Sequence, residues 1–164
     1  MSSPSESKRL SRGAMIALSL VGLGALCVPC TGAIAAIALP SFMRYTREAK
    51  AAEARMNLSA LRGLAERAEG PLALGPTPPL DTLGAEGRPF GDEPGWRALG
   101  FAPLEPVRYS YVVLRDPAAG TVHVEATGDL DADGVRSRFF VDGRLDPAVG
   151  PVAWGETIEL DPLE

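Results

Sequence analysis

The chain is poor in several residue types, and each shortage excludes a class of function. Its 164 residues include 2 Cys and 1 His, and only 6% are aromatic. Both cysteines, Cys27 and Cys30, lie in one apolar run, so the rest of the chain has no thiol for a disulfide. With His123 as the single histidine, no zinc-ligand spacing is present, and neither is a nucleophile elbow or a phosphate-binding loop. We therefore expect a protein that is not an enzyme.

Positive charge is also in short supply. The chain carries 16 Lys and Arg against 21 Asp and Glu, which gives a formal net charge of −5. Because phosphate backbones are bound by clustered cations, this balance argues against a nucleic-acid partner. The length corresponds to one small domain beyond the N-terminal region, which excludes a large multi-domain enzyme.

Charged residues are missing altogether from residues 13–43. As a helix this run would extend roughly 46 Å at 1.5 Å per residue, against a hydrocarbon core near 30 Å. The run predicts a membrane-spanning helix, with residues 1–12 as a short basic cytoplasmic leader and the C-terminal domain exported. A cleaved secretory signal is the alternative.

Three interpretations are open for Cys27-Val-Pro-Cys30 within this run. The spacing is that of a redox pair, although a lipid-buried position raises a thiol pKa. Cys27 could also be a lipidated residue. The third interpretation is two small apolar residues packed in a helix, with Pro29 producing a local kink.

Residues 44–68 predict the amphipathic second half of the same helix. Two series of residues recur at steps of three and four, as helix faces do. The first comprises Phe42, Tyr45, Ala49, Ala52 and Met56, and the second comprises Ala54, Leu58, Leu61, Ala65 and Ala68. We expect the first to face neighbouring subunits or a membrane surface and the second to face the chain's own domain. A plain amphipathic helix on one core is the alternative.

The stretch Gly32-Ala-Ile-Ala-Ala-Ile-Ala-Leu-Pro-Ser-Phe-Met-Arg-Tyr45, followed by Arg47-Glu-Ala-Lys50 and Glu53-Ala-Arg-Met-Asn-Leu58, resembles a type IV pilin. The resemblance implies a long N-terminal helix that holds the subunit in the inner membrane and later packs in a filament core. It assigns Pro40, Phe42 and Tyr45 to the helix and to assembly. It further implies a small antiparallel sheet packed on the helix beyond Pro40.

Two positions depart from the family pattern. With Pro40 aligned to the family's proline, Leu18 stands where the leader glycine is expected and Leu23 where the fifth-residue glutamate is expected. Gly13 is the glycine that follows a basic stretch, so leader cleavage after Gly13 and methylation of Ala14 are the processing that the resemblance implies.

The remaining residues predict a loop and then a sheet. Residues 69–106 are rich in Gly and Pro, which predicts a loop region. We expect Trp96, Leu99 and Phe101 to anchor it in the core, and an exposed binding patch is the alternative. Residues 107–164 alternate apolar and polar positions, which predicts an antiparallel sheet of three to four strands. The expected fold is α+β and pilin-like, with the helix covering the sheet.

An acidic loop joins two of the predicted strands. Gly128-Asp-Leu-Asp-Ala-Asp-Gly134 has the Asp-x-Asp-x-Asp-Gly form of a calcium loop, with Asp129, Asp131, Asp133 and the Val135 carbonyl as ligands. Phe140 occupies the position of the bidentate glutamate of an EF-hand, so an EF-hand is excluded. A solvated acidic turn without Ca²⁺ is the alternative.

These observations lead to two functional hypotheses. The first is a structural subunit of a type IV pilus or a type II secretion pseudopilus, a minor or divergent pilin whose partners are other pilin-like subunits and the assembly platform. It would be a single-pass inner-membrane protein with a periplasmic C-terminal domain, or part of a cell-surface filament. The second is an unprocessed single-pass protein whose exported domain binds a partner or Ca²⁺.

Overall fold

The computed structural model describes residues 12–145 and 151–163, and within the first helix the side chains of residues 12, 14 and 17–35 lie outside the described part. The chain divides into two compact units, Met1–Met43 and Arg44–Glu164. The elements follow in the order α1 (Arg12–Arg67), β1 (Leu72–Thr77), η1 (Leu80–Thr82), α2 (Pro94–Leu99), β2 (Tyr109–Asp116), β3 (Thr121–Gly128), β4 (Ser137–Arg144), β5 (Ala153–Trp154) and β6 (Ile158–Leu160).

The amino-acid composition of helix α1 explains why it is long. Its second half is rich in Ala, Leu, Arg and Glu, which are strong helix formers. Pro40 lies inside the helix, which continues past it. The end is marked by a bond from the Ala68 N–H to the Leu64 carbonyl, by Gly70 with φ of 76°, and by Pro71. Glycine adopts positive φ without strain and proline cannot extend a helix, so the helix stops there.

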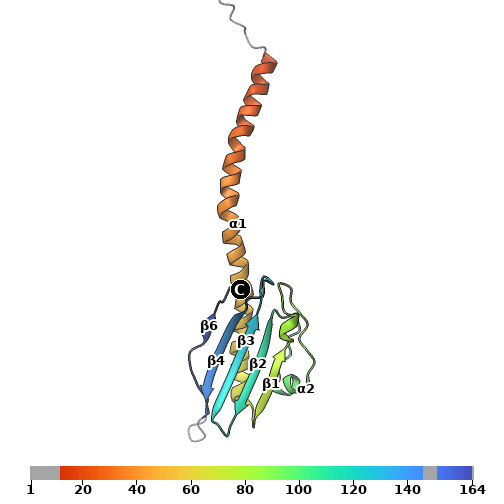
Figure 1. The fold of residues 1–164 in the computed structure, drawn as a ribbon, viewed down its shortest axis with the longest axis vertical. Helices are drawn as coiled ribbons and strands as arrows, with labels where there is room; N and C mark the ends of the chain where they lie inside the picture. Colours follow the sequence, from red (N-terminus) through yellow and green to blue (C-terminus); the bar gives the residue numbers. More distant parts are fainter. Residues whose placement is uncertain (1–11, 146–150, 164) are drawn as a thin grey trace, which may run out of the picture. The chain divides into compact units, whose positions relative to one another are not determined.

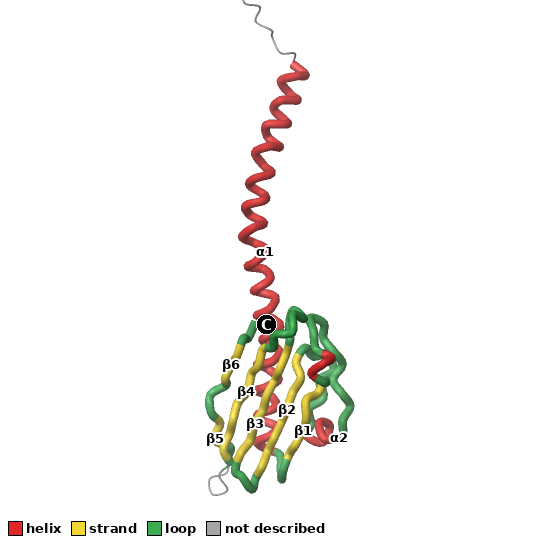
Figure 2. Tube along the Cα trace, viewed as in Figure 1, coloured by secondary structure: helices red, strands yellow, loops and turns green. Residues whose placement is uncertain are grey.

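The six-stranded antiparallel sheet belongs to the second unit (Figures 1 and 2). Its strands run in the order β1-β2-β3-β4-β5, and β6 pairs with β4. The central ladders join β2 to β3 and β3 to β4 along eight residues each. Long uninterrupted ladders hold β3 in register, because a one-residue slip would turn its buried side chains to the other face.

The core lies between this sheet and the part of α1 within the second unit. On β3, Val122, Val124 and Ala126 are buried, while the intervening residues are partly exposed. From the helix, the core receives Ala51, Ala54, Leu58, Leu61 and Ala65. Four of these residues belong to the second predicted series, so the prediction that this series faces the chain's own domain is confirmed.

A polar network also joins the helix to the sheet. Glu53 accepts hydrogen bonds from the Arg108 backbone N–H at 2.8 Å and from Arg108 Nη1 at 3.1 Å. Asn57 Nδ2 donates to the buried Tyr111 hydroxyl at 2.7 Å. Burial raises the pKa of Tyr111 well above its usual value, so the phenol stays protonated. These directional contacts fix the position of the helix along β2.

Residues 69–106 contain more regular structure than the predicted loop. Strand β1 pairs with β2 in spite of Gly75 and Pro76, and its register shifts between Leu74 and Thr77. Helix α2 begins at Pro94 and ends at Gly100 with φ of 86°. The core anchoring of Trp96, Leu99 and Phe101 is confirmed: Trp96 and Phe101 are buried, Leu99 is partly buried, and Trp96 Nε1 donates to Thr77 Oγ1 at 3.0 Å.

Two predictions about the fold are wrong. The sheet has six strands instead of three to four, because β1 lacks the regular alternation that marks a strand in sequence and the C-terminal tail forms two short strands, β5 and β6. Among the residues that the structure describes, no helix is long and apolar enough to cross a membrane. This finding contradicts the predicted membrane-spanning first half of the helix and the single-pass inner-membrane localisation that depended on it.

Candidate functional site

The acidic loop between β3 and β4 brings together the three carboxylates that the sequence singles out. One oxygen from each of Asp129, Asp131 and Asp133 lies within 4.8 Å of the other two. Asp129 accepts bonds from the backbone N–H groups of Ala132 at 2.7 Å and Gly134 at 3.1 Å. Ala132 has a φ of 63° and Gly134 a φ of 91°. The Asp129 carboxylate thus holds the chain in a left-handed bend that turns the other two carboxylates toward it.

Helix α1 supplies two cations to this loop. Arg47 Nη2 donates to Asp131 Oδ2 at 2.6 Å, and Arg47 Nη1 donates to the Leu163 carbonyl at 3.2 Å. Lys50 Nζ donates to the Leu130 carbonyl at 3.4 Å and to the Ala85 carbonyl at 3.5 Å. The guanidinium and the ammonium offset part of the repulsion among the three carboxylates. Sequence reasoning missed both residues, because they contact a loop about eighty positions further along the chain.

The loop meets the requirements of a calcium site only in part. In its favour, the three carboxylates converge, and Asp131 Oδ1 is buried without a hydrogen-bond partner in the described part of the chain. Against it, Ca²⁺ takes six to eight oxygens, and Arg47 already binds the other oxygen of Asp131. Val135 uses its N–H to bond Asp133, and its side chain is exposed. The structure therefore brings the three predicted carboxylate ligands together, but its described residues do not provide the set of oxygen ligands that Ca²⁺ requires.

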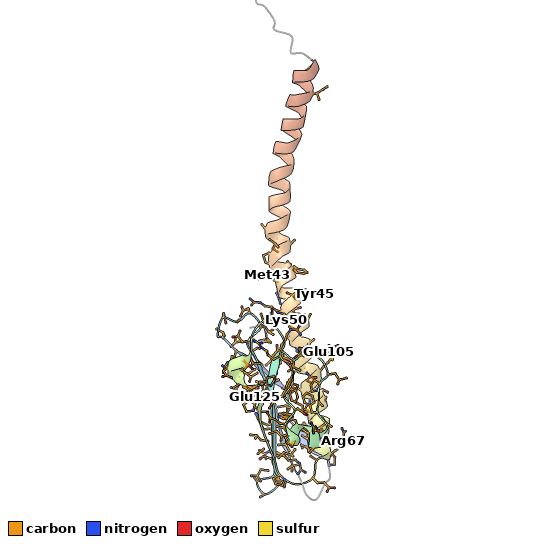
Figure 3. All side chains as sticks on the ribbon, turned by 90° about the vertical axis from the view of Figure 1, so that its right-hand side faces the viewer. Met43, Tyr45, Lys50, Arg67, Glu105 and Glu125 are labelled. Carbon is orange, nitrogen blue, oxygen red and sulfur yellow. The ribbon has the colours of Figure 1, made fainter. Side chains whose placement is uncertain are left out.

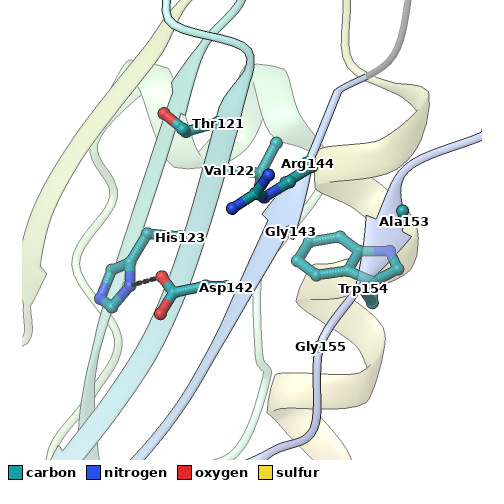
Figure 4. A pocket seen from close by; sticks show the side chains of 9 residues that line it. All are labelled: Thr121, Val122, His123, Asp142, Gly143, Arg144, Ala153, Trp154 and Gly155. Carbon is teal, nitrogen blue, oxygen red and sulfur yellow. Dashed lines mark hydrogen bonds and ion pairs between the residues drawn. The ribbon is translucent and has the colours of Figure 1, made fainter.

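A second titratable cluster occupies the face of the sheet turned away from α1. His123 Nδ1 lies 2.7 Å from Asp142 Oδ1 (Figure 4). His123 Nε2 lies 3.3 Å from Glu125 Oε2. Glu125 also accepts bonds from Arg138 Nη2 at 2.8 Å and from Thr127 Oγ1 at 2.7 Å. His123 lies on the face of β3 opposite Val122 and Val124, which are buried.

The two carboxylates hold His123 in its protonated form. Both ring nitrogens face acceptors, and only the imidazolium has two N–H donors. The hydrogen bond to Glu125, followed by that to Asp142, raises the pKa of His123 above its usual value. The same bond to His123, with those from Arg138 and Thr127, lowers the pKa of Glu125. Glu125 has more influence than the nearer Asp142 because its side chain is 17% exposed, against 69%.

A cavity of about 590 Å³ adjoins this cluster, lined by residues of β3, β4 and β5 that include His123, Asp142 and Arg144 (Figure 4). Its lining contains both positive and negative side chains, and His123 and Asp142 are hydrogen-bonded to each other. The described residues offer no nucleophile there in contact with a base. We find no arrangement in the cavity that would carry out a reaction.

The first predicted series on α1 is exposed. Within the second unit it comprises Tyr45, Ala49, Ala52 and Met56, whose spacing of four, three and four places them on one face of the helix. Tyr45 is 70% and Met56 72% exposed, and Tyr45 can be located in Figure 3. We call these four residues the exposed stripe. Within the first unit, Phe42 is also exposed.

For the residues predicted to take part in processing and for the two cysteines, the structure gives only the position on α1 or no side-chain description. Gly13 is an exposed residue in the first turn of α1 and Pro40 is exposed further along it. The side chains of Ala14, Cys27 and Cys30 lie outside the described part of the chain. Leader cleavage, methylation and the role of the cysteines therefore stay predictions.

Comparisons with protein-family models, with curated proteins and with solved structures found no match for this chain. The resemblance to type IV pilins accordingly rests on the residues quoted above.

Proposed function

We propose that this chain is a structural subunit of a pilus-like or pseudopilus-like filament, in which α1 packs against the helices of neighbouring subunits. The observation that carries the proposal is the exposed stripe. The opposite face of α1 fills the domain's own core, so the stripe has no intramolecular role. Its contact residues include two small side chains, Ala49 and Ala52, which would allow another helix to approach closely.

The stripe also has suitable chemistry for self-association. An apolar row along a helix is costly to leave in water, and each large side chain that becomes fully buried contributes about 1.5–3 kcal/mol. Tyr45 and Met56 therefore provide most of the gain. The charged neighbours Arg44 and Glu48 pair with each other across the helix surface at 3.1 Å, so they add no unpaired charge to the contact. The expected partners are other copies of this chain or similar subunits.

The test is recovery of the chain in filaments sheared from cells that produce it, compared with a Met56→Glu variant. A carboxylate at position 56 would be buried in the contact without a partner, so we expect the sheared fraction to contain at least tenfold less of the variant. Leu104→Glu is the matched control, since Leu104 is fully exposed on a loop. Absence of the native chain from sheared filaments, or wild-type incorporation of Met56→Glu, would show that the proposal is wrong.

A further inference from the structure

A small cavity lies between α1 and the C-terminal segment of the second unit. Its volume is about 200 Å³, and its lining consists of Arg55, Leu58, Ser59, Arg62, Thr157 and Glu159. The four helix residues recur at steps of three, one and three, so they share one face of α1. The other two residues are Glu159 in strand β6 and Thr157, which directly precedes this strand. Neither the acidic loop nor the His123 cluster contributes to this cavity.

One of its two arginines is already neutralised. Arg55 Nε donates to Glu159 Oε1 at 2.8 Å, and Arg55 Nη2 donates to Glu159 Oε2 at 2.7 Å. This two-pronged hydrogen bond raises the pKa of Arg55 and lowers that of Glu159. Both oxygens of the only carboxylate in the lining are thereby used, while Arg55 Nη1 keeps its N–H groups for another acceptor.

The second arginine, Arg62, has no anionic partner among the described residues. The Arg62 guanidinium lies over the Trp154 ring, with 5.1 Å between its central carbon and the ring centroid. A cation on an aromatic face gains electrostatic energy without using its N–H donors. In the described part of the chain, no carboxylate pairs with Arg62, and the hydroxyls of Ser59 and Thr157 make no side-chain hydrogen bond. The lining thus has a surplus of donors and a net charge of +1.

We propose that this cavity binds an oxyanion, a carboxylate or a phosphate group, with Arg62 as its principal cation. Arg55 Nη1 and the hydroxyls of Ser59 and Thr157 supply the additional donors. An oxyanion presents two or more acceptor oxygens, which is what an excess of converging donors requires. The Arg55–Glu159 pair and the Trp154 ring hold the two guanidiniums in place, so little ordering is needed on binding.

The test is calorimetric titration of the full-length chain with sodium phosphate, at an ionic strength held constant with sodium chloride. We expect saturable binding in the wild type and at least tenfold weaker binding in Arg62→Gln, because a charge-assisted contact is lost. Arg67→Gln is the matched control: the same change of charge on the same helix, at an exposed residue outside the lining. Thr157→Val, which removes one donor at the surface, should weaken binding several-fold and serves if Arg62→Gln does not fold.

Two sources of the oxyanion can be distinguished by sedimentation with and without phosphate. If phosphate lowers self-association of the wild type but not of Arg62→Gln, the natural occupant is a carboxylate of a second copy. If phosphate binds without changing self-association, the occupant is a free anion. Either result supports the cavity as an oxyanion site. The proposal is overturned if phosphate and chloride give the same heat, or if Arg62→Gln and Arg67→Gln bind phosphate equally well.

Discussion

Replacing Arg47 by methionine tests whether α1 holds the acidic loop in place. The substitution keeps an unbranched side chain but removes the contacts to Asp131 Oδ2 at 2.6 Å and to the Leu163 carbonyl at 3.2 Å. Both members of the ion pair are less than a third exposed, at 28% and 27%. Hydrogen bonds to charged groups contribute about 1.5–3 kcal/mol when they are largely shielded from water. We therefore expect the free energy of unfolding to fall by about 2 kcal/mol.

Repulsion within the loop acts in the same direction. At 4.8 Å and an effective dielectric constant of about 20, two carboxylates repel each other by roughly 3 kcal/mol, and by about 1 kcal/mol in bulk water. The guanidinium offsets part of this energy in the wild type. Because the loop can relax into solvent when Arg47 is absent, we expect the loss to stay near 2 kcal/mol, which corresponds to a fall in Tm of about 8 °C.

Urea and thermal unfolding followed by circular dichroism give the two quantities. Arg44→Met is the matched control, since Arg44 lies one turn earlier and pairs with Glu48 where both side chains are well exposed. Exposed pairs at this spacing contribute about 0.3–0.5 kcal/mol. Equal effects of the two substitutions would refute the view that Arg47 anchors the loop.

The same variant shows whether the guanidinium competes with a divalent cation. A ligand that binds only the folded state raises its stability. If the Arg47 guanidinium takes the place that a cation would occupy beside the carboxylates, millimolar CaCl₂ should raise the Tm of Arg47→Met more than that of the wild type, with NaCl at the same ionic strength as the control. An equal response of the two proteins would contradict this competition.

Two further predictions concern the sheet. Gly128→Ala should lower the free energy of unfolding in urea by about 1–3 kcal/mol, because a Cβ at this position would lie 2.6 Å from the buried Tyr109 ring. Gly75→Ala is the control and should be neutral or slightly stabilising, since its Cβ would meet nothing within 4 Å. Equal stability of the two variants would disprove the steric argument. The raised pKa of His123 implies that its ion pairs contribute fully below its unfolded pKa of about 6.5 and are lost as pH rises through the folded-state pKa. His123→Gln should flatten this part of the stability curve, and an unchanged slope would show that another group titrates there.

The strands that could be predicted from the sequence are those with a local signal. In β2, β3 and β4 the buried apolar residues recur at every second position, and that recurrence is a local signal of a strand with one buried face. Strand β1 contains Gly75 and Pro76 and is stabilised only by pairing with β2, a contact that no local pattern indicates. The same reasoning explains why the two series on α1 were separable: helical spacing is a local property, and one series proved buried while the other is exposed.

The predictions that failed or were incomplete concern features that depend on contacts between residues far apart in the sequence or on the environment of a segment. A run without charge, residues 13–43, indicated a membrane span from composition, a conclusion that the described helix does not support. The spacing of Asp129, Asp131 and Asp133 predicted their convergence because they lie on one tight turn. The contact between Arg47 and this turn, and the cavity beside Arg62, bring together residues that are distant in sequence, so only the folded structure places them.

The most direct test of the proposed assembly is site-specific photo-crosslinking at Met56 in cells that produce the chain. A benzophenone side chain at this position lies on the exposed stripe, so the account predicts covalent multimers of the chain that resist boiling in detergent. The same side chain at Leu104, on an exposed loop, should give few. A monomer band alone at position 56, or equal crosslinking at the two positions, would contradict the claim that the stripe packs between subunits.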